Sequence, residues 1–195
     1  MQAKRNMYIQ LLDANGLFKR EAEGYDWLRI DKSTLGEVSD SVQTENRDYI
    51  DSAAASTEVT GHQLSQAQEI ILDTSNPCFR AIDNFYRHYY TGVDCTVPAA
   101  QTYPLYTADG TIDKEKWIAQ VWDEATVMVT ALAYKEGRYS MTINYNGDPK
   151  NGYITKGEDG KFKFEEDDTV LDEITVAADM LSASPARIST KKSEE

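Results

Sequence analysis

The sequence predicts a mainly β protein: a β-sandwich or partly open barrel with one flanking α-helix and long polar loop or arm extensions. Three observations support this class. Several short segments alternate apolar and polar residues, a single segment has helical periodicity, and no alternating βα rhythm runs along the chain. These segments predict about six to eight strands, one helix packed on one side of them and one long polar loop.

The first third of the chain predicts a strand, a long polar loop and a second strand region. Residues 24–30, GYDWLRI, predict the first short strand, with Trp27 as a core or interface anchor. Residues 31–56 lose hydrophobic density and predict a long loop, and loops of this length usually bind something or lack fixed structure. From Thr57 onward, alternating apolar or small residues predict one or two strands bent at Gly61.

The central helix is predicted at SNPCFRAIDNFYRHYYTG. Ser75 or Asn76 can cap it, Pro77 suits the first turn, and Gly92 suits a left-handed position after the last turn. Apolar side chains recur at steps of three and four, which predicts a helix lying on a sheet. These side chains are Phe79, Ile82, Phe85, Tyr86 and Tyr89.

The second half predicts further strands. Residues 93–116 look irregular, whereas residues 117–134 form the strongest strand signal. A turn at 135–137 then leads into RYSMTINYNG, which predicts a hairpin with one buried face. The segments GYITK, KFKFE and LDEITVA predict three more short strands. We expect a single domain at 1–180 and a flexible C-terminal tail at 181–195, which is rich in Ser, Lys and Glu.

Charge and composition exclude several classes of protein. The formal net charge of −13 opposes a surface that grips nucleic-acid phosphates. No apolar run approaches the roughly 18 residues of a membrane span, and the amino terminus does not resemble a signal peptide, so we expect a soluble protein without a membrane partner. Cys78 and Cys95 are expected to be free thiols.

Motifs for catalysis, metals and cofactors are missing from the sequence. His62 is expected on a sheet face and His88 as a partly buried packing residue, since neither stands in a metal-binding spacing. TADGTIDKEKW resembles half of a calcium loop, but Leu105 and Lys116 occupy its first and last ligand positions. We therefore predict no catalytic residue, no metal and no cofactor.

Acidic residues gather near the end of the expected domain. A glycosidase needs only two carboxylates at a suitable distance, but with so many acids a chance pair is nearly certain. The alternatives are a solvated surface or a wall of negative charge that repels a polyanion. The candidate lumen or surface acids are Glu165, Glu166, Asp167, Asp168, Asp172 and Glu173.

The order of the segments resembles the major tail tube proteins of long, non-contractile-tailed bacteriophages. The resemblance spans residues 25–180 and is carried by order and spacing. Its parts are the Trp-containing strand, the polar loop with ENRDYID, STEVTGHQLSQAQEIIL, NPCFRAIDNFYRHYY and the hairpin that ends in NYNGDPKNGYI.

The resemblance implies a virion protein, made in the host cytoplasm, that forms hexameric rings stacked into a tube. Strands from each subunit would join an inner barrel around a partly acidic channel, through which double-stranded DNA passes without specific binding. Residues 31–56 would reach a neighbouring subunit or ring. Expected partners are further copies, a tape measure protein, and tail-tip and terminator proteins. The candidate contacts are Asp48, Tyr49, Ile50, Ser52, Thr57 and Val59.

Three other functions remain open from the sequence. The inner tube of a contractile tail or of a tail-derived injection system shares the fold that the resemblance implies. A carbohydrate-binding or adhesin-like β-sandwich could use Trp27, Trp117 and Trp122 as stacking platforms, and an acid-pair hydrolase could use the acidic cluster. Exposure separates the adhesin from the tube subunit, because binding platforms leave aromatic rings in water.

Overall fold

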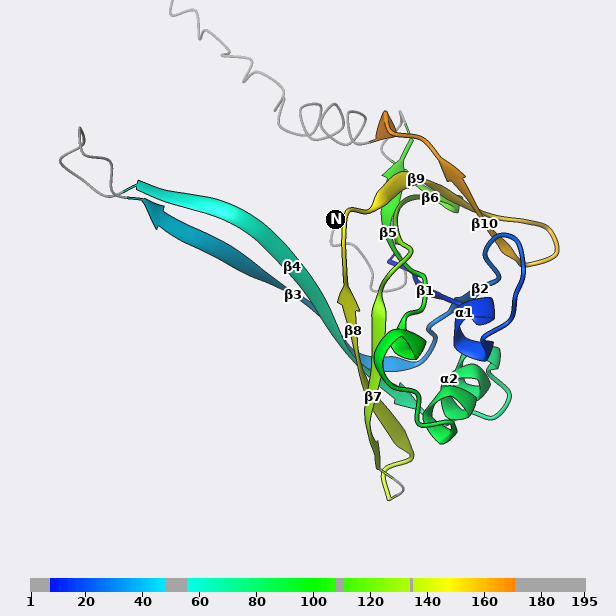
Figure 1. Ribbon diagram of the computed structural model, residues 1–195. Helices are drawn as coiled ribbons and strands as arrows, with labels where there is room; N and C mark the ends of the chain where they lie inside the picture. The colour runs from blue at the N-terminus through cyan, green and yellow to red at the C-terminus, as the bar shows by residue number, and fades with distance from the viewer. Residues whose placement is uncertain (1–7, 48–55, 108–110, 134, 171–195) are drawn as a thin grey trace, which may run out of the picture.

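The computed structural model describes residues 8–47, 56–107, 111–133 and 135–170. It confirms a mainly β protein with two antiparallel sheets and one main helix (Figure 1). The expected strand at LDEITVA and the expected tail at 181–195 lie outside the described residues.

A six-stranded sheet forms one layer of the body, in the order β10-β9-β6-β5-β1-β2. Its neighbouring strands all run antiparallel. Its strands are β1 (Gln10–Asp13), β2 (Trp27–Arg29), β5 (Ala99–Tyr106), β6 (Ile112–Trp122), β9 (Lys150–Lys156) and β10 (Phe162–Glu166).

A four-stranded sheet forms the second layer, in the order β3-β4-β8-β7. Its strands are β3 (Ser33–Arg47), β4 (Ser56–Ile71), β7 (Thr126–Ala133) and β8 (Arg138–Tyr145). The helices are α1 (Ala14–Phe18), α2 (Pro77–Arg87) and the 3-10 helix η2 (Gly92–Cys95). The described residues thus contain more strands than the six to eight expected, partly because β1 and β5 were not predicted.

The expectation that residues 93–116 are irregular is wrong, since they hold β5 and the start of β6. Four successive residues of β5 are buried, from Ala99 to Thr102, so the strand lacks the alternation that marks a half-buried strand. Pro104 is tolerated because it lies beyond the stretch of β5 that pairs with β1, which ends at Gln101.

Residues 117–134 do not form one strand, as the sequence suggested, but parts of two strands in different sheets. β6 ends at Trp122 in the six-stranded sheet, and β7 begins at Thr126 in the four-stranded sheet. The exposed Asp123 and Glu124 lie at the crossing. The boundary between the two strands could not be recognised in the sequence, because the residues before and after it are both largely apolar.

The predicted hairpin with one buried face is confirmed as β7 and β8. Every second residue of β8 is buried to 4% exposure or less, and these residues face α2 within the main core. They are Tyr139, Met141, Ile143 and Tyr145.

The predicted start of α2 is confirmed, whereas its predicted end is wrong. Asn76 caps the helix, because its Oδ1 accepts a 2.8 Å hydrogen bond from the backbone N–H of Cys78. The helix ends at Arg87, and Tyr89 takes the left-handed conformation with φ 50°. Gly92 also has positive φ, but it opens η2 instead of ending α2.

Candidate assembly surfaces

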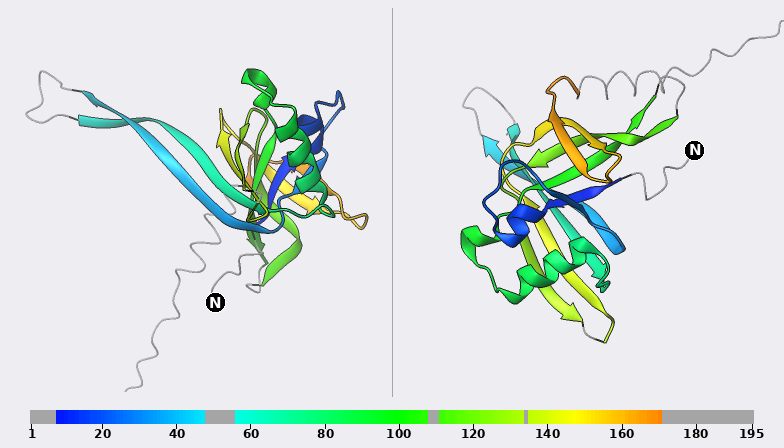
Figure 2. Two further views of the ribbon diagram at one scale, coloured as in Figure 1. Left: turned by 90° about the horizontal axis from the view of Figure 1, so that it is seen from below. Right: turned by 90° about the vertical axis from the view of Figure 1, so that its right-hand side faces the viewer.

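The longest strand pair continues far beyond the body. β3 and β4 pair from Ser33–Ile70 to Arg47–Ser56, but β8 accompanies β4 only from Leu64 to Ile71. The remainder is a two-stranded ribbon that projects from the body (Figures 1 and 2). We call β3 and β4 together the arm.

The prediction of a loop at 31–56 is wrong for Ser33–Arg47, because these residues form strand β3.

The arm has one apolar and one polar face. The pairing register places Val38, Val42 and Val59 on the face that continues the core-facing side of the sheet, and they are 45%, 48% and 54% exposed. Gln43 pairs with Gly61, and the next residue, Thr44, pairs with Val59, so β4 has one extra residue at this point. This β-bulge puts Val59 on the same face as Val42. The apolar face of the arm is thus uncovered. The opposite face carries Glu37, Ser39, Ser41, Gln43 and Glu45.

A hydrogen-bonded pair of side chains lies on the apolar face of the arm. The Nδ1 of His62 on β4 is 2.8 Å from the Oδ2 of Asp40 on β3. His62 pairs with Val42, so it lies on a sheet face as the sequence predicted. His88 was expected to be partly buried, but it is exposed, because α2 ends just before it. Its ring stacks on Tyr90 with ring centroids 5.3 Å apart.

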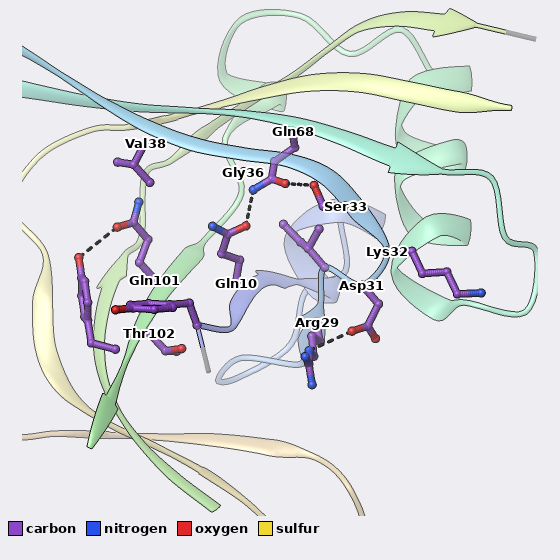
Figure 3. A pocket seen from close by; sticks show the side chains of 13 residues that line it. Gln10, Arg29, Asp31, Lys32, Ser33, Gly36, Val38, Gln68, Gln101 and Thr102 are labelled. Carbon is purple, nitrogen blue, oxygen red and sulfur yellow. Dashed lines mark hydrogen bonds and ion pairs between the residues drawn. The ribbon is translucent and has the colours of Figure 1, made fainter. Parts of the chain in front are cut away.

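A hollow of about 530 Å³ lies between the two sheets at the base of the arm (Figure 3). Its walls come from both sheets and from the segment that joins β2 to β3. The side chains include Gln10 of β1, Gln101 of β5, Gln68 of β4 and Val38 of β3. We call this cavity the hollow.

The hollow has a hydrogen-bonded amide wall. The Ser33 hydroxyl donates to the Gln68 Oε1, and the Gln68 Nε2 donates to the Gln10 Oε1. Gln101 is 6% exposed, and its Nε2 approaches the Tyr145 hydroxyl without forming a hydrogen bond of good geometry. Figure 3 shows this nitrogen on the side toward Val38. This nitrogen is buried in the wall of the hollow.

Two ion pairs border the hollow. Arg29 Nε lies 2.9 Å from the Asp31 carboxylate, and Lys32 pairs with Asp73. Hydrogen bonds from Lys32 and Ser75 lower the pKa of Asp73 below its usual range. The charges at this rim are therefore balanced within the chain.

Two of the six predicted contact residues are described, and both lie on β4. Asp48, Tyr49, Ile50 and Ser52 fall outside the described residues. Thr57 lies on β4 opposite Asn46, and Val59 lies on the apolar face of the arm. The structure thus describes two of the six positions, and both belong to the arm.

Four of the six predicted acids are described, and they lie on β10 or directly after it. Glu165 and Glu166 are exposed on β10, at the edge of the six-stranded sheet. Asp167 accepts hydrogen bonds from the hydroxyl and the backbone N–H of Thr169, which lower the pKa of Asp167. Asp168 is exposed, whereas Asp172 and Glu173 lie outside the described residues. The described acids therefore lie at the edge of the six-stranded sheet, whereas the arm belongs to the four-stranded sheet.

The face of the four-stranded sheet that points away from α2 is lined with small polar side chains. Alternation along β8 puts Ser140, Thr142 and Asn144 on this face, and the register adds Ser65 of β4 together with the small apolar Ala67. We call it the hydroxyl face. The sequence contained this signal, since the alternation in RYSMTINY already separates these residues from the buried ones.

Within the described ranges, no group of three or more His, Cys, Asp and Glu side chains is arranged to hold a metal ion. No described helix is long and apolar enough to cross a membrane. Trp27, Trp117 and Trp122 are all buried, at 5%, 6% and 2% exposure. They therefore cannot act as surface platforms for sugars in this state of the chain.

No protein-family model matches the sequence, and no curated protein matches it significantly. The fold, in contrast, matches a solved structure. A chain from the tail of an empty gene transfer agent (GTA) particle, refined with C6 symmetry, has 10% sequence identity and a TM-score of 0.51. The match covers 77% of this chain and 98% of that chain.

The chain shares its fold with a tail protein. Weaker likenesses are to a chain of the native GTA virion and to a chain of the anti-feeding prophage baseplate, with TM-scores of 0.47 and 0.43. Their identities are 10% and 8%, and the matches cover 77% and 80% of this chain and 98% and 97% of those chains. The shared fold therefore rests on the first of these chains, whose TM-score is 0.51.

Proposed function

We propose that the protein is the repeating subunit of the tail tube of a long, non-contractile-tailed phage, and that it acts by assembly, without catalysis or a cofactor. One observation supports this most: the arm projects from the body with an uncovered apolar face. The fold shared with a chain of a tail particle agrees with it.

The exposed valines of the arm require a partner. An isolated apolar side chain on a surface is ordinary, but Val38, Val42 and Val59 follow one face of a ribbon that continues the core-facing side of its sheet. A neighbouring copy that covers this face removes apolar area from water on assembly. Val59, a contact residue expected from the sequence, belongs to this face.

The four-stranded sheet also has two edges available for pairing. β3 lies at one edge and β7 at the other, and each presents unpaired backbone groups within the described part of the sheet. Pairing the β7 edge of one copy with the β3 edge of the next satisfies both edges, and a ring of copies closes them into a barrel. We propose six copies in each ring, the symmetry of the tail that shares the fold.

In this arrangement the hydroxyl face lines the channel. Its charged groups include Glu37 and Glu69, and the Arg138 guanidinium lies 3.2 Å from Glu69. The serine, threonine and asparagine side chains give DNA few cationic groups to bind. Together with the net charge of −13, such a channel lets double-stranded DNA pass without specific binding. The acids at Glu165 to Asp168 then lie outside the channel.

The remaining proposals follow from the tube. The protein belongs in the virion tail after synthesis in the host cytoplasm. Its partners are further copies, a tape measure protein, and tail-tip and terminator proteins at the two ends. These partners are expectations from the resemblance described above.

Negative-stain electron microscopy at rising protein concentration, together with sedimentation, tests the proposal. We expect rings or hollow tubes whose channel admits duplex DNA. The matched variant is Val42→Glu, which puts a carboxylate on the exposed apolar face and should suppress assembly without unfolding the protein. A wild-type protein that stays monomeric even with a tail-tip complex present contradicts the proposal.

A further inference from the structure

We propose that assembly takes up a proton at His62, so that copies of the chain assemble more readily below neutral pH than above it. This inference rests on the proposed function, since it concerns the apolar face of the arm that a neighbouring copy covers. Three observations support it: the place of His62 on that face, its hydrogen bond to Asp40, and the uncharged surroundings of the pair.

His62 cannot stay in contact with water when the apolar face of the arm is covered. It lies directly opposite Val42 in the pairing register, and the β-bulge places Val59 on the same side of the ribbon. Asp40 lies between Val38 and Val42 along β3. In the single chain, the side chains of His62 and Asp40 are 60% and 37% exposed. A neighbour that covers the three valines therefore also covers the His62–Asp40 pair.

The hydrogen bond between the two side chains determines which ring nitrogen carries the hydrogen. The Nδ1 of His62 is 2.8 Å from the Oδ2 of Asp40. An ionised carboxylate can only accept a hydrogen bond, so the Nδ1 carries a hydrogen and donates it. A second proton can then bind only at Nε2, which leaves this hydrogen bond intact. His62 can thus change its charge without a change in the structure of the arm.

The pair has a different net charge in the two protonation states of His62. With a neutral ring, the carboxylate leaves one uncompensated negative charge on the apolar face, whereas with a protonated ring the pair is neutral overall. Removing an uncompensated charge from water costs much more free energy than removing a hydrogen-bonded pair of opposite charges. Covering the face therefore favours the protonated ring. This contribution to assembly is present at low pH and is lost as rising pH removes the proton.

The apolar face of the arm contains no other charge that could compensate Asp40. Among the side chains that the structure describes on this face, only Asp40 and His62 are ionisable, and Glu37 and Glu45 lie on the opposite face. The neighbouring strand β8 turns only uncharged side chains toward this side of the sheet. Asp148, in the turn after β8, forms neither a hydrogen bond nor an ion pair with His62.

The cations at the base of the arm are already paired. Arg29 pairs with Asp31, and Lys32 pairs with Asp73. Within the described residues, this part of the chain therefore offers the apolar face no spare cation. The compensating charge has to come from a proton.

The small number of histidines makes the inference specific. The whole chain contains two, and histidine is the side chain that ordinarily changes its charge between pH 5 and 8. His88 is exposed after α2, where its ring stacks on Tyr90. It belongs to the body and not to the arm, so it provides an internal control.

Sedimentation at pH 6 and pH 8 and constant ionic strength tests the inference, with electron microscopy to identify the sedimenting rings or tubes. We expect the wild type to need about tenfold less protein for assembly at pH 6, because one histidine is protonated more readily in the assembly. His88→Gln should keep this difference. His62→Gln should abolish it and assemble at both pH values about as poorly as the wild type does at pH 8, since the Asp40 carboxylate stays uncompensated.

Asp40→Asn gives the sharpest result, because the sign of the pH dependence should reverse. Without the carboxylate, the neutral ring of His62 leaves no charge on the covered face, whereas the protonated ring leaves an unpaired positive charge. This variant should therefore assemble better at pH 8 than at pH 6, which a purely structural role of the hydrogen bond does not predict.

The outcomes separate this inference from the proposed function. Wild-type protein that assembles equally well at both pH values, or better at pH 8, overturns the inference alone. The same holds if Asp40→Asn keeps the sign of the wild type. If the wild type forms no assembly at either pH, both proposals fail.

Discussion

The Tyr139 hydroxyl on β8 donates a 2.5 Å hydrogen bond to the Asp83 carboxylate on α2. This bond joins the helix to the four-stranded sheet at the edge of the main core. Tyr139→Phe keeps the ring and removes the donor, so the free energy of unfolding should fall by about 1.5–3 kcal/mol, the range for a hydrogen bond to a charged group. Urea denaturation measures it. Tyr86→Phe, for whose hydroxyl the described residues offer no partner, should change stability much less.

Asp83 also predicts a pH dependence. Partial burial favours its protonated form, but hydrogen bonds from Tyr139 and Arg87 outweigh this and lower the pKa of Asp83. Because the folded pKa lies below the unfolded value of about 3.9, the carboxylate stabilises the fold above that pH. The contribution is lost as pH falls through the folded pKa. The stability difference between wild type and Asp83→Asn should therefore shrink from about pH 6 to pH 3, and a constant difference contradicts this assignment.

The Asn76 cap predicts a matched pair of variants. Its Oδ1 accepts from the backbone N–H groups of Cys78 and Phe79, at 2.8 and 3.4 Å. Asn76→Ala should lower the free energy of unfolding by about 1 kcal/mol, whereas Asn76→Asp should restore most of it. Thermal unfolding of the three proteins is sufficient. Equal loss in both variants would show that the side chain does not act as a cap.

Gly152 of β9 has no room for a side chain. A Cβ at this position would lie 2.1 Å from the backbone oxygen of Glu165 and 2.9 Å from the Cα of Glu166, both on β10. Gly152→Ala should displace β10 and cost about 1–3 kcal/mol. Gly61→Ala, whose Cβ would have its nearest contact at 3.7 Å on the Gln43 side chain, is the control and should be neutral or slightly stabilising. Hydrogen exchange of β10 amides will report the displacement.

The two cysteines should differ in reactivity. Burial raises the pKa of the Cys78 thiol to about 12, so almost no reactive thiolate is present at pH 8. Cys95 is half-buried, and its Sγ donates to the Tyr90 carbonyl at 3.2 Å. Brief treatment of the folded protein with iodoacetamide should give one adduct by intact mass, at Cys95. Unfolded protein should give two, and two rapid adducts on the folded protein would contradict the burial of Cys78.

Local patterns predicted the elements whose environment differs between two faces. β8 alternates because one face packs on α2, and α2 begins at Asn76 because a capping side chain and Pro77 meet there. Where both faces of a strand are equally exposed or equally buried, apolar and polar residues no longer alternate along it. Much of β3 is exposed on both faces and resembled a loop, whereas β5 begins with four buried residues and resembled irregular structure.

The surfaces for assembly were only partly predictable. Val59 emerged from the resemblance, and the structure places it with Val38 and Val42. The hollow could not be found from spacing, because Gln10, Gln68 and Gln101 come from three distant strands. Tyr89 was wrongly placed on the helix because it fits the helical periodicity, although α2 ends two residues earlier, at Arg87.

The central place of β1 has a consequence for how the nascent chain matures. β1 is the first described strand, yet it lies inside the six-stranded sheet, and the backbone N–H of Ile9 bonds to Thr102 Oγ1 across 93 residues. Until β5 leaves the ribosome, only the three-residue β2 can pair with β1 in this sheet. At 5–20 residues per second this interval lasts roughly 5 to 20 s. During that time Leu11 and Leu12, which are 1% and 0% exposed in the finished sheet, lack the β5 strand that helps to cover them.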